Sequence, residues 1–485
     1  MDLFLDSRAG KALAGQLYDQ LRLAINEGRL LPGDRLTPSR QLAVELGVSR
    51  HTVATAYGRL VAEGYAEGRA GGGSVVAPTS AAGPCAPSPA HALRPARRFT
   101  DWEPIFRLPG PSFRYDLTPG QPDPGLFPAI AWRRRVAAAA AAEYLGYGDP
   151  LGQCGLRRAI AGWITRSRSV RSSENAIVVT AGAQHAIDLV ARVLLETGDT
   201  VAVEEPGYPP VGKLFAALGA RVAAVPVDGE GLIVDRLPPS ARIVYVTPSH
   251  QFPLGMTMSM PRRRALLRWA QDHDAAVIED DYDTEFRYVD RPLEPLQALD
   301  DAGRVIYVGS FSKTFSPAVR LGFAVVPPSL ADPIAALRQL IDWHPPTAMQ
   351  AALAGFIEDG LLDKHLRRCR RAYAERRGLL AEAISGPLSA YLTAGTANAG
   401  LHITTYLRPG LSEDAVRRSA RRQGIRTMGL QRAFRASPPQ PGLLLGFGAI
   451  PATALPAAVR TLEEIMAAHA AEARTAPEHR PGQRT

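Results

Sequence analysis

The stretch Gly309-Ser-Phe-Ser-Lys-Thr314 is the most informative part of this chain for its fold and its chemistry. It follows an apolar, strand-like run and places the amine of Lys313 behind the hydroxyl groups of Ser310 and Ser312. A lysine amine forms an imine with an aldehyde, and the two hydroxyl groups together with the guanidinium group of Arg320 can bind a phosphate. Pyridoxal phosphate carries both an aldehyde and a phosphate. The stretch therefore predicts a site for this cofactor.

Composition limits the number of lysine amines that could bind the cofactor aldehyde. The chain has 56 Lys and Arg residues, but its only lysines are Lys11, Lys213, Lys313 and Lys364. Lys313 alone combines hydroxyl-bearing neighbours with a preceding strand-like run, so it is the predicted attachment residue. The alternative is an ordinary surface lysine in a serine-rich loop.

The length of the chain, 485 residues, exceeds what one ordinary core accommodates and predicts two or three domains. Hydrophobic residues make up 46% and charged residues 21%, which is typical of a soluble globular protein. The N-terminus lacks the basic and apolar regions of a secretory signal, so we expect a cytoplasmic protein with no membrane partner. The three cysteines, Cys85, Cys154 and Cys369, lie far apart and argue against a disulfide framework or a metal site.

Net charge does not identify a nucleic-acid-binding region. The whole chain carries +9, but residues 1–77 contain nine Lys plus Arg against eight Asp plus Glu. A prediction of DNA binding must therefore rest on the geometry of a motif rather than on bulk charge.

Residues 1–77 have the pattern of three helices followed by two short strands. Apolar residues at four-residue spacing predict a first helix that ends at Gly28. The second helix is predicted to begin with Thr37 as its cap and Pro38 at its first position, and the third with Ser49. The positions expected to face the core are Leu17, Leu21, Ile25, Leu42, Ala43, Leu46, Val53, Tyr57, Leu60 and Val61.

The start of the third helix leaves Arg50, His51 and Thr52 outside the apolar stripe, where a recognition helix presents side chains to base edges. The glycine-rich span 65–77 then predicts a two-stranded wing. The alternative is a helical docking domain whose arginines only solvate its surface.

The pattern L-x-P-G-D-R-L-x-P-S-R-x-L-A-x-x-L-G-V-S-R-x-T-V at residues 30–53 resembles a winged helix-turn-helix domain of the GntR type. One departure is that Thr37-Pro38 stands where Pro-Ser is more usual. The resemblance implies binding to a double-stranded DNA operator, with phosphate contacts supplying affinity and base contacts supplying specificity. The residues implied to touch DNA are Arg35, Arg40, Ser49, Arg50, His51 and Thr52, with Arg69 and Gly73 in the wing at the minor groove.

Residues 78–114 are rich in Pro, Ala and Arg and show no apolar periodicity, so we expect an extended linker. Its five arginines against two acids allow a second contact with DNA phosphate, although simple solvation is the alternative.

Residues 115–470 alternate short β-branched runs with helical stretches, which predicts an α/β domain with a mostly parallel sheet. Residues 471–485 are expected to form a flexible tail. The predicted strands are 176–180, 200–203, 242–246, 276–278, 304–308 and 323–326. Because cofactors bind such sheets at the strand ends, the residues after each strand are candidates for the site.

Three of these strand ends carry candidate cofactor contacts. Ala183 and Gln184 open a helix, so that their backbone amides can hold a phosphate at its positive end. Tyr208 offers an aromatic surface near the cofactor ring. His250, in Ser-His-Gln after the strand 242–246, is a further candidate.

A fourth strand end, Ile278-Glu-Asp-Asp-Tyr282, supplies an acid and a phenol. We assign Asp280 to the pyridine nitrogen, because a carboxylate there keeps the ring protonated and able to withdraw electrons. Tyr282 is assigned to the phenolic oxygen of the cofactor. Strand alternation turns Asp281 the other way and makes it the weaker choice.

The whole of residues 115–470 resembles an aspartate aminotransferase-type domain of fold type I. With the GntR-type domain before it, the chain resembles the MocR subfamily of bacterial transcriptional regulators, notably in P-S-H-Q-F-P-L-G at 248–255 and G-S-F-S-K-T-F-S-P-A-V-R-L-G at 309–322. The resemblance implies an internal aldimine on Lys313 and a homodimer packed head to tail.

Aminotransferases of this fold commonly hold the substrate carboxylate with an arginine on a late strand. The nearest counterpart here, Leu443-Leu-Leu-Gly-Phe447, has Leu444 at that place, so a bidentate clamp is missing there. Arg426, Arg432 or Arg435 could reach in from the preceding loop instead.

We therefore predict a transcriptional regulator that binds pyridoxal phosphate through Lys313 and responds to the cofactor or to an amine that reacts with it. Two other interpretations remain. One is an active aminotransferase with an appended DNA-binding domain, which turnover of amino donors would reveal. The other is a DNA-binding dimer whose large domain is a scaffold without cofactor, which would be colourless.

Overall fold

The structure is a computed structural model, and it describes residues 3–6, 10, 12–69, 73–78, 93–96, 99, 113–141, 146–288, 293–396 and 399–475. The chain divides into two compact units, Met1–Asp101 and Trp102–Thr485. Each unit is described by itself. None of the helices in the described part of the chain is long and apolar enough to cross a membrane.

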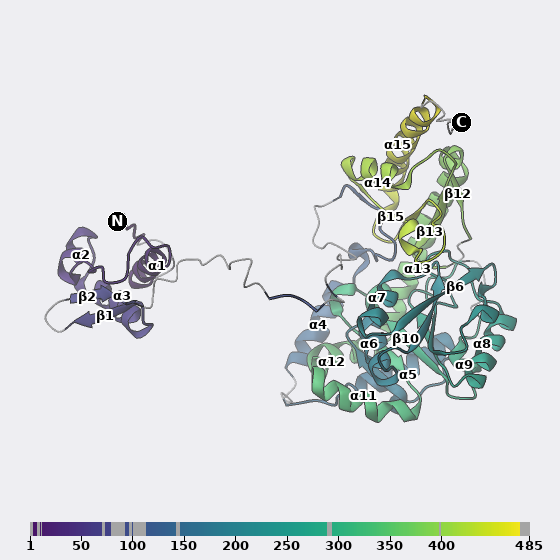
Figure 1. Cartoon of the computed structure of the whole chain (residues 1–485), viewed down its shortest axis with the longest axis horizontal. Coiled ribbons are helices and arrows are strands. Elements are labelled where there is room, and N and C mark those ends of the chain that lie inside the picture. Colours follow the sequence, from purple (N-terminus) through teal and green to yellow (C-terminus); the bar gives the residue numbers. More distant parts are fainter. Residues whose placement is uncertain are drawn as a thin grey trace, which may run out of the picture. The chain divides into compact units, whose positions relative to one another are not determined.

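The N-terminal unit contains three helices and a two-stranded antiparallel sheet, as the sequence predicts (Figure 1). The elements are α1 Leu13–Asn26, α2 Ser39–Glu45, α3 Arg50–Ala62, β1 Ala66–Arg69 and β2 Gly73–Val76. Gly28 has a φ of 72° just after α1, a backbone conformation that favours glycine, and the chain turns there.

The apolar stripes of the three helices meet in one core, with one correction to the predicted set. Val61 is 42% exposed, and Ala56 faces the core in its place, because positions three and seven after Val53 lie on the same side of α3. Leu46 is half-buried and packs against this core, as predicted. The predicted positions that are fully buried are Leu17, Leu21, Ile25, Leu42, Ala43, Val53, Tyr57 and Leu60.

The predicted start of the second helix is wrong by one residue. α2 begins at Ser39, its cap position is Pro38, and no side chain caps it. The backbone carbonyl of Thr37 accepts a hydrogen bond from the Tyr57 hydroxyl at 2.7 Å. Thr37 therefore links the turn before α2 to α3 through its carbonyl, and it does not cap α2. Ser49 is confirmed as the cap of α3, since its hydroxyl accepts from the Thr52 amide at 3.1 Å.

The C-terminal unit is built on an eight-stranded sheet with strand order β4-β11-β10-β9-β8-β5-β6-β7. Strands β6, β5, β8, β9 and β10 run parallel to one another, whereas β11 is antiparallel to both of its neighbours and β7 is antiparallel to β6. The predicted, mostly parallel sheet is therefore confirmed. The strands are β4 Ile177–Thr180, β5 Thr200–Glu205, β6 Arg221–Asp228, β7 Gly231–Leu232, β8 Ala241–Val246, β9 Ala276–Asp281, β10 Val305–Ser310 and β11 Gly322–Val325.

Helices cover both faces of this sheet (Figure 1). Alternate strand residues belong to different cores: Val179 and Tyr307 pack with α5, α12 and α13, while Val178 and Ile306 pack with α6, α7 and α11. The helices are α4 Ala129–Ala140, α5 Cys154–Arg168, α6 Ala183–Leu194, α7 Pro209–Ala217, α8 Met260–Asp272, α9 Leu296–Leu299, α10 Phe311–Thr314, α11 Pro328–Ile341, α12 Thr347–Glu358, α13 Leu361–Ser385, α14 Glu413–Arg422 and α15 Leu455–Thr475.

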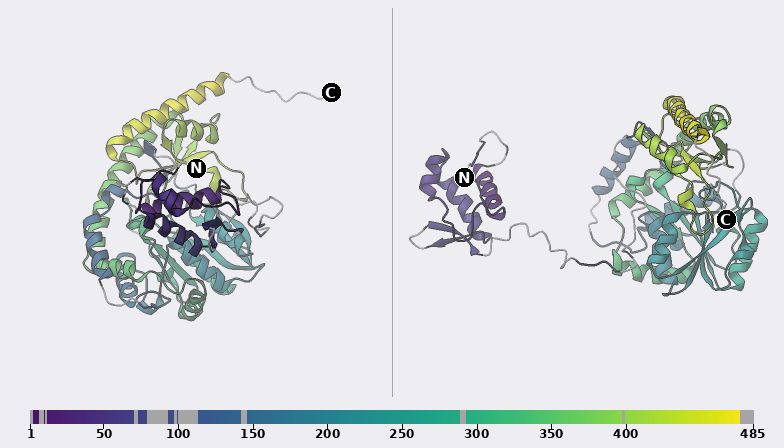
Figure 2. Two further views of the ribbon diagram at one scale, coloured as in Figure 1. Left: turned by 90° about the vertical axis from the view of Figure 1, so that its left-hand side faces the viewer. Right: turned by 45° about the horizontal axis from the view of Figure 1, so that its top comes forward.

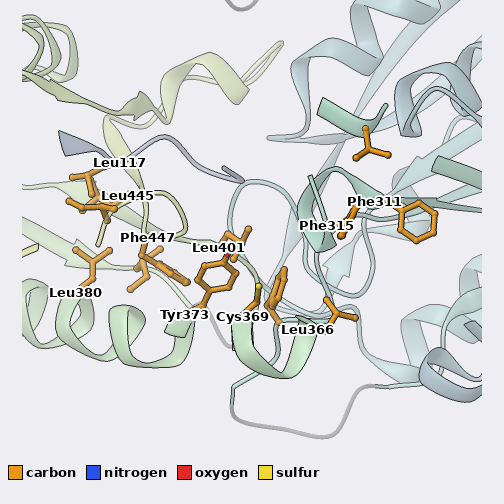
Figure 3. Packing of buried hydrophobic residues seen from close by; sticks show 14 of the residues in the cluster. Leu117, Phe311, Phe315, Leu366, Cys369, Tyr373, Leu380, Leu401, Leu445 and Phe447 are labelled. Carbon is orange, nitrogen blue, oxygen red and sulfur yellow. The ribbon is translucent and has the colours of Figure 1, made fainter. Parts of the chain in front are cut away.

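A smaller sheet with order β12-β13-β16-β15 forms the other end of this unit. Figure 3 shows side chains of the long helix α13 packing toward Phe315 near the large sheet and toward Leu445 of the small one. The strands are β12 Leu392–Ala394, β13 His402–Leu407, β15 Met428–Gly429 and β16 Gly442–Gly446, and a separate parallel pair joins β3 Tyr115–Asp116 to β14 Ile425–Arg426. α15 packs on α14 (Figure 2) and continues to Thr475, past the start of the expected tail.

Candidate functional site

A cavity of about 290 Å³ lies at the ends of β8, β9 and β10, beside the start of α6. It brings together nearly all the cofactor contacts predicted from the sequence. Those that line it are Ala183, Gln184, Tyr208, Asp280, Tyr282, Ser310, Ser312, Lys313 and Arg320. Sequence reasoning did not find several other lining residues, namely Thr118, Gly120, Gln121, Tyr245, Thr247, Phe252, His402 and Met428.

Lys313 enters the cavity from α10, a single turn that follows β10 directly. Ser310 caps this turn, since its hydroxyl accepts from the Ser312 amide at 3.1 Å. The amine lies against Gly120: a Cβ added there would come within 3.1 Å of Lys313 Nζ, and the φ of Gly120 is 70°. Burial lowers the pKa of Lys313, while Asp283 and Asp280 oppose that shift. A lowered pKa increases the neutral fraction of the amine, which is the form that attacks an aldehyde.

Asp280 is buried at the end of β9 with one oxygen satisfied and one not. The Tyr245 hydroxyl donates to its Oδ2 at 2.6 Å, whereas its Oδ1 has no hydrogen-bond partner among the described residues. Burial raises the pKa of Asp280 to about 7, although the Tyr245 hydrogen bond opposes this. A buried acceptor without a donor fits a ligand that brings its own proton, such as a pyridinium nitrogen.

Asp281 belongs to a different environment. It forms a buried ion pair with Arg168 and accepts a hydrogen bond from the Tyr307 hydroxyl at 2.6 Å. Burial alone opposes ionisation of Asp281, but the Arg168 guanidinium group and the hydrogen bonds from Thr284 and Tyr307 hold its pKa below the usual value. Alternation along β9 thus turns Asp280 toward the cavity and Asp281 toward Arg168.

The start of α6 forms the anion-attracting end of the cavity. Gly182 precedes this helix with a φ of 101°, and Ala183 and Gln184 are its first residues. Arg320 lies alongside: its guanidinium group donates to the Ala181 carbonyl, and a Cβ on Gly182 would approach that group to 3.2 Å. Free amides at a helix start, a guanidinium group and the hydroxyl groups of Ser310 and Ser312 together fit a phosphate.

Aromatic rings form another wall. Tyr208 follows β5, and its ring meets that of Phe252 edge to face with centroids 5.4 Å apart. Burial raises the pKa of Tyr208 to about 12, so its phenol stays protonated near neutral pH. Such a wall suits a flat aromatic ligand.

His250 does not line the cavity and lies behind Tyr282. Its Nδ1 is 3.0 Å from the Tyr282 hydroxyl and 2.9 Å from Asp283 Oδ1. Phe252, two residues later, reaches the cavity instead. The structure therefore places His250 where it can orient Tyr282 and outside the lining of the cavity.

The side chains expected to touch DNA lie on the surface of the N-terminal unit. Thr52 is half-buried, with its Oγ1 2.9 Å from Ser49 Oγ. Gly73 pairs with Arg69 in the wing, and the side chain of Arg69 lies outside the described part of the chain. The remaining expected contacts, all exposed, are Arg35, Arg40, Ser49, Arg50 and His51.

Comparison with known proteins assigns both units. Residues 13–76 match the family of bacterial regulatory proteins, gntR family, and residues 115–439 match aminotransferase class I and II. The probable rhizopine catabolism regulatory protein MocR of Rhizobium meliloti is 38% identical over 462 residues, which cover 92% of this chain and 92% of that protein. The chain belongs to the MocR-type transcriptional regulators.

Other MocR-type relatives and solved aminotransferases support this assignment. The pyridoxine biosynthesis transcriptional regulator PdxR of Corynebacterium glutamicum is 32% identical over 448 residues, 92% of this chain and 94% of that protein. A kynurenine aminotransferase of Pyrococcus horikoshii, solved in complex with PMP, superposes with a TM-score of 0.67 and 27% identity over 73% of this chain and 90% of that one. The family thus joins a GntR-type DNA-binding domain to an aminotransferase fold.

Proposed function

We propose that this MocR-type regulator attaches pyridoxal phosphate to Lys313 and changes its DNA binding when the cofactor, or an amine that reacts with it, occupies the cavity. The observation that carries the proposal is the buried amine of Lys313 in one cavity with an oxygen of Asp280 that has no hydrogen-bond partner in the part of the chain that the structure describes. When bound, the cofactor supplies an aldehyde that reacts with amines and a ring that withdraws electrons. Relatives point the same way, since PdxR is named for pyridoxine biosynthesis.

Each end of the cavity has a separate binding task. Asp280 accepts a proton-bearing ring nitrogen, and the bound cation in turn favours the ionised carboxylate. The start of α6, Arg320 and the two serines neutralise the phosphate at the other end. Tyr282 donates to the phenolic oxygen of the ring, held in place by His250. The amine of Lys313 lies among these groups, where a bound aldehyde can reach it.

The DNA-binding role is assigned to the N-terminal unit. GntR-type domains bind DNA operators, and we place Arg50, His51 and Thr52 of α3 against base edges. Arg35, Arg40 and the wing at Gly73 would contact the backbone and the minor groove. A homodimer packed head to tail would present two such units to paired half-sites.

The cavity lacks a residue that aminotransferases of this fold commonly use, an arginine on the late strand that holds the substrate carboxylate. Leu444, at the place of the expected arginine, is fully buried in an apolar cluster with Phe252 and Leu430. It cannot orient a substrate carboxylate from β16, where aminotransferases of this fold commonly hold it, so we assign the domain to sensing, with turnover of amino donors expected to be slow. Release of an oxo acid from amino donors would measure that rate directly.

The first experiment is the visible absorption spectrum of the full chain with added pyridoxal phosphate, before and after borohydride reduction. Lys313→Ala removes the proposed attachment residue, and Lys364→Ala, an exposed lysine on α13, is the matched control. We expect a visible band that borohydride bleaches in the parent and in Lys364→Ala, leaving the cofactor covalently attached. The band should be absent from Lys313→Ala. A colourless parent would instead support a scaffold without cofactor.

A further inference from the structure

The cavity contains one cation that the proposed cofactor does not use. Among the described residues, its lining contains three lysine and arginine side chains: Lys313, Arg320 and Arg426. Lys313 is assigned to the aldehyde, and Arg320 lies at the start of α6 where the phosphate is placed. Arg426 comes from a different region, the short strand β14.

Backbone pairing fixes where Arg426 lies. β14 pairs in parallel with β3, so that Arg426 stands opposite Asp116, and the Leu117 amide donates to the Arg426 carbonyl at 2.8 Å. The chain that leaves β3 continues into the cavity wall at Thr118 and Gly120. Gly120 lies against the Lys313 amine, so the segment that pairs with Arg426 leads directly to that amine.

The contacts that the structure shows for Arg426 engage few of the N–H donors of its guanidinium group. Its pairing with Asp116 is loose, because the nitrogen to oxygen distance is 3.9 Å and both side chains are about one-third exposed (29% and 32%). The other oxygen of Asp116 accepts from the Thr118 amide at 2.9 Å. The remaining contact of the guanidinium group that the structure shows is with the ring of Phe113, 5.6 Å from its centroid. A guanidinium group carries five N–H donors in a planar fork that matches a carboxylate.

The other arginines considered from the sequence do not reach the cavity. Arg432 is exposed. Arg435 donates its backbone amide to Glu205 at 2.9 Å, and its guanidinium group lies near Gly212, within 3.1 Å of where a Cβ would stand. Neither residue lines the cavity among the described residues, and Leu444 is apolar. Arg426 is therefore the side chain available there for an acidic ligand group.

We infer that Arg426 binds the carboxylate of an amine ligand, so that this regulator responds to amino acids in preference to simple amines. The inference rests on the proposed function, because the amine of the same ligand must react at the cofactor held by Lys313. It moves carboxylate recognition from the late strand β16, where Leu444 stands, to β14. A bidentate pair between Arg426 and a carboxylate would fix one end of the ligand while its amine reaches the Lys313 side of the cavity.

The contact between Arg426 and Phe113 connects ligand binding in the cavity to a residue outside its lining. Phe113 is the first described residue after the segment 100–112, next to the end of the predicted linker, and Arg421 also lies over its ring at 5.4 Å. A ligand carboxylate competes with Asp116 and with the Phe113 ring for one guanidinium group. Ligand binding at Arg426 thus acts on Phe113, at the C-terminal end of the predicted linker.

Pairs of ligands that differ by a carboxylate test the inference. The full chain loaded with pyridoxal phosphate is titrated with β-alanine against ethylamine and with 4-aminobutyrate against propylamine, and the change in visible absorbance gives each dissociation constant. A charge-assisted pair predicts that at least one amino acid binds about ten- to one-hundred-fold more tightly than its partner amine. Arg426→Gln should abolish this preference and leave amine binding and the cofactor band unchanged. Arg432→Gln is the matched control and should behave as the parent.

The outcomes separate the two proposals. A cofactor band with no carboxylate preference in the parent, or a preference that persists in Arg426→Gln, would overturn the role of Arg426 and leave the proposed function standing. Absence of a Lys313-dependent band would overturn both. Partial rescue of the preference by Arg426→Lys, which keeps the charge but loses the planar fork, would support direct contact with the carboxylate.

Discussion

The buried carboxyl group of Asp280 provides a test at the scale of one residue. Its burial suits the cofactor but destabilises the cofactor-free protein. Its pKa rises from the usual value for aspartate to about 7 in the folded state, chiefly through burial. Between about pH 4 and 7 the unfolded chain ionises this group while the folded chain does not, so its contribution to stability falls as pH rises. We expect Asp280→Asn to become more stable than the cofactor-free parent over this range, by on the order of 1–4 kcal/mol at pH 8.

Denaturant unfolding of both cofactor-free proteins at pH 4.5 and pH 8 measures that difference. With pyridoxal phosphate present the order should reverse, since the neutral amide of the Asp280→Asn variant cannot hold the ring nitrogen as a carboxylate does. A variant that is less stable than the parent at pH 8 without cofactor would contradict the assignment of a buried, unpaired carboxyl.

Individual site residues were predictable where local sequence carries the chemistry. Asp280 lies at the end of β9 and Lys313 in the single turn after β10, and alternation was enough to separate Asp280 from Asp281. His250 was not predictable in the same way, because the loop after β8 turns back, with the Gln251 amide donating to the Met256 carbonyl at 2.9 Å, and Phe252 lines the cavity instead. Arg426 remained one of three possibilities, since only the pairing of β14 with the distant β3 brings it there.

At the scale of elements, α3 should show separate effects of its cap and its charge. Ser49 caps the helix through the Thr52 amide, so Ser49→Ala should lower the free energy of unfolding of the N-terminal unit by about 1 kcal/mol. Ser49→Asp keeps a capping oxygen and should retain that stability, but it should weaken operator binding because its charge faces DNA phosphate. Thermal unfolding and fluorescence anisotropy on operator DNA distinguish the two. Equal DNA affinity for Ser49→Asp and the parent would remove Ser49 from the interface.

The exposed arginine at the start of α3 provides a second test of this element. Arg50→Ala should weaken operator binding and leave the cofactor band intact. If Arg50 also neutralises a DNA phosphate, the slope of log affinity against log salt concentration should fall by about one, because one fewer counterion is released on binding. Arg171→Ala removes the same charge from an exposed site in the large unit and serves as the control. Unchanged affinity in Arg50→Ala, measured over a salt series, would rule out α3 as the recognition helix.

Element boundaries were harder to predict than element types, for a physical reason visible in β5 and β9. The β-branched runs ended the predicted strands before their acidic residues, yet β5 continues through Glu205 and β9 through Asp281. Buried partners contact these carboxylates, although one oxygen each of Glu204 and Asp280 has no hydrogen-bond partner among the described residues. Glu204 accepts from the Thr247 amide at 3.2 Å, and Glu205 accepts from amides of the loop 435–437. Those partners come from distant segments, so nothing in the neighbouring residues indicates that the strand can continue.

At the scale of the whole molecule, the cavity must influence a DNA-binding unit joined to it through the predicted linker. Phe113, beside the end of that linker and in contact with Arg426, is the residue through which we expect this to happen. Phe113→Ala should keep the cofactor band and the carboxylate preference, because neither depends on the ring. The change in operator affinity on adding an amino acid should shrink, since the ligand then has no stacked contact to alter.

Operator affinity of the cofactor-loaded protein, measured by anisotropy with and without a saturating amino acid, gives that change as a ratio. Arg421→Gln removes the other cation from the Phe113 ring without touching the cavity lining, so it should retain most of the response. By linkage, operator DNA should shift amino acid affinity by the same factor as the amino acid shifts DNA affinity, and Phe113→Ala should reduce both together. A full response in Phe113→Ala would mean that the signal leaves the cavity by another route and that Arg426 acts in recognition alone.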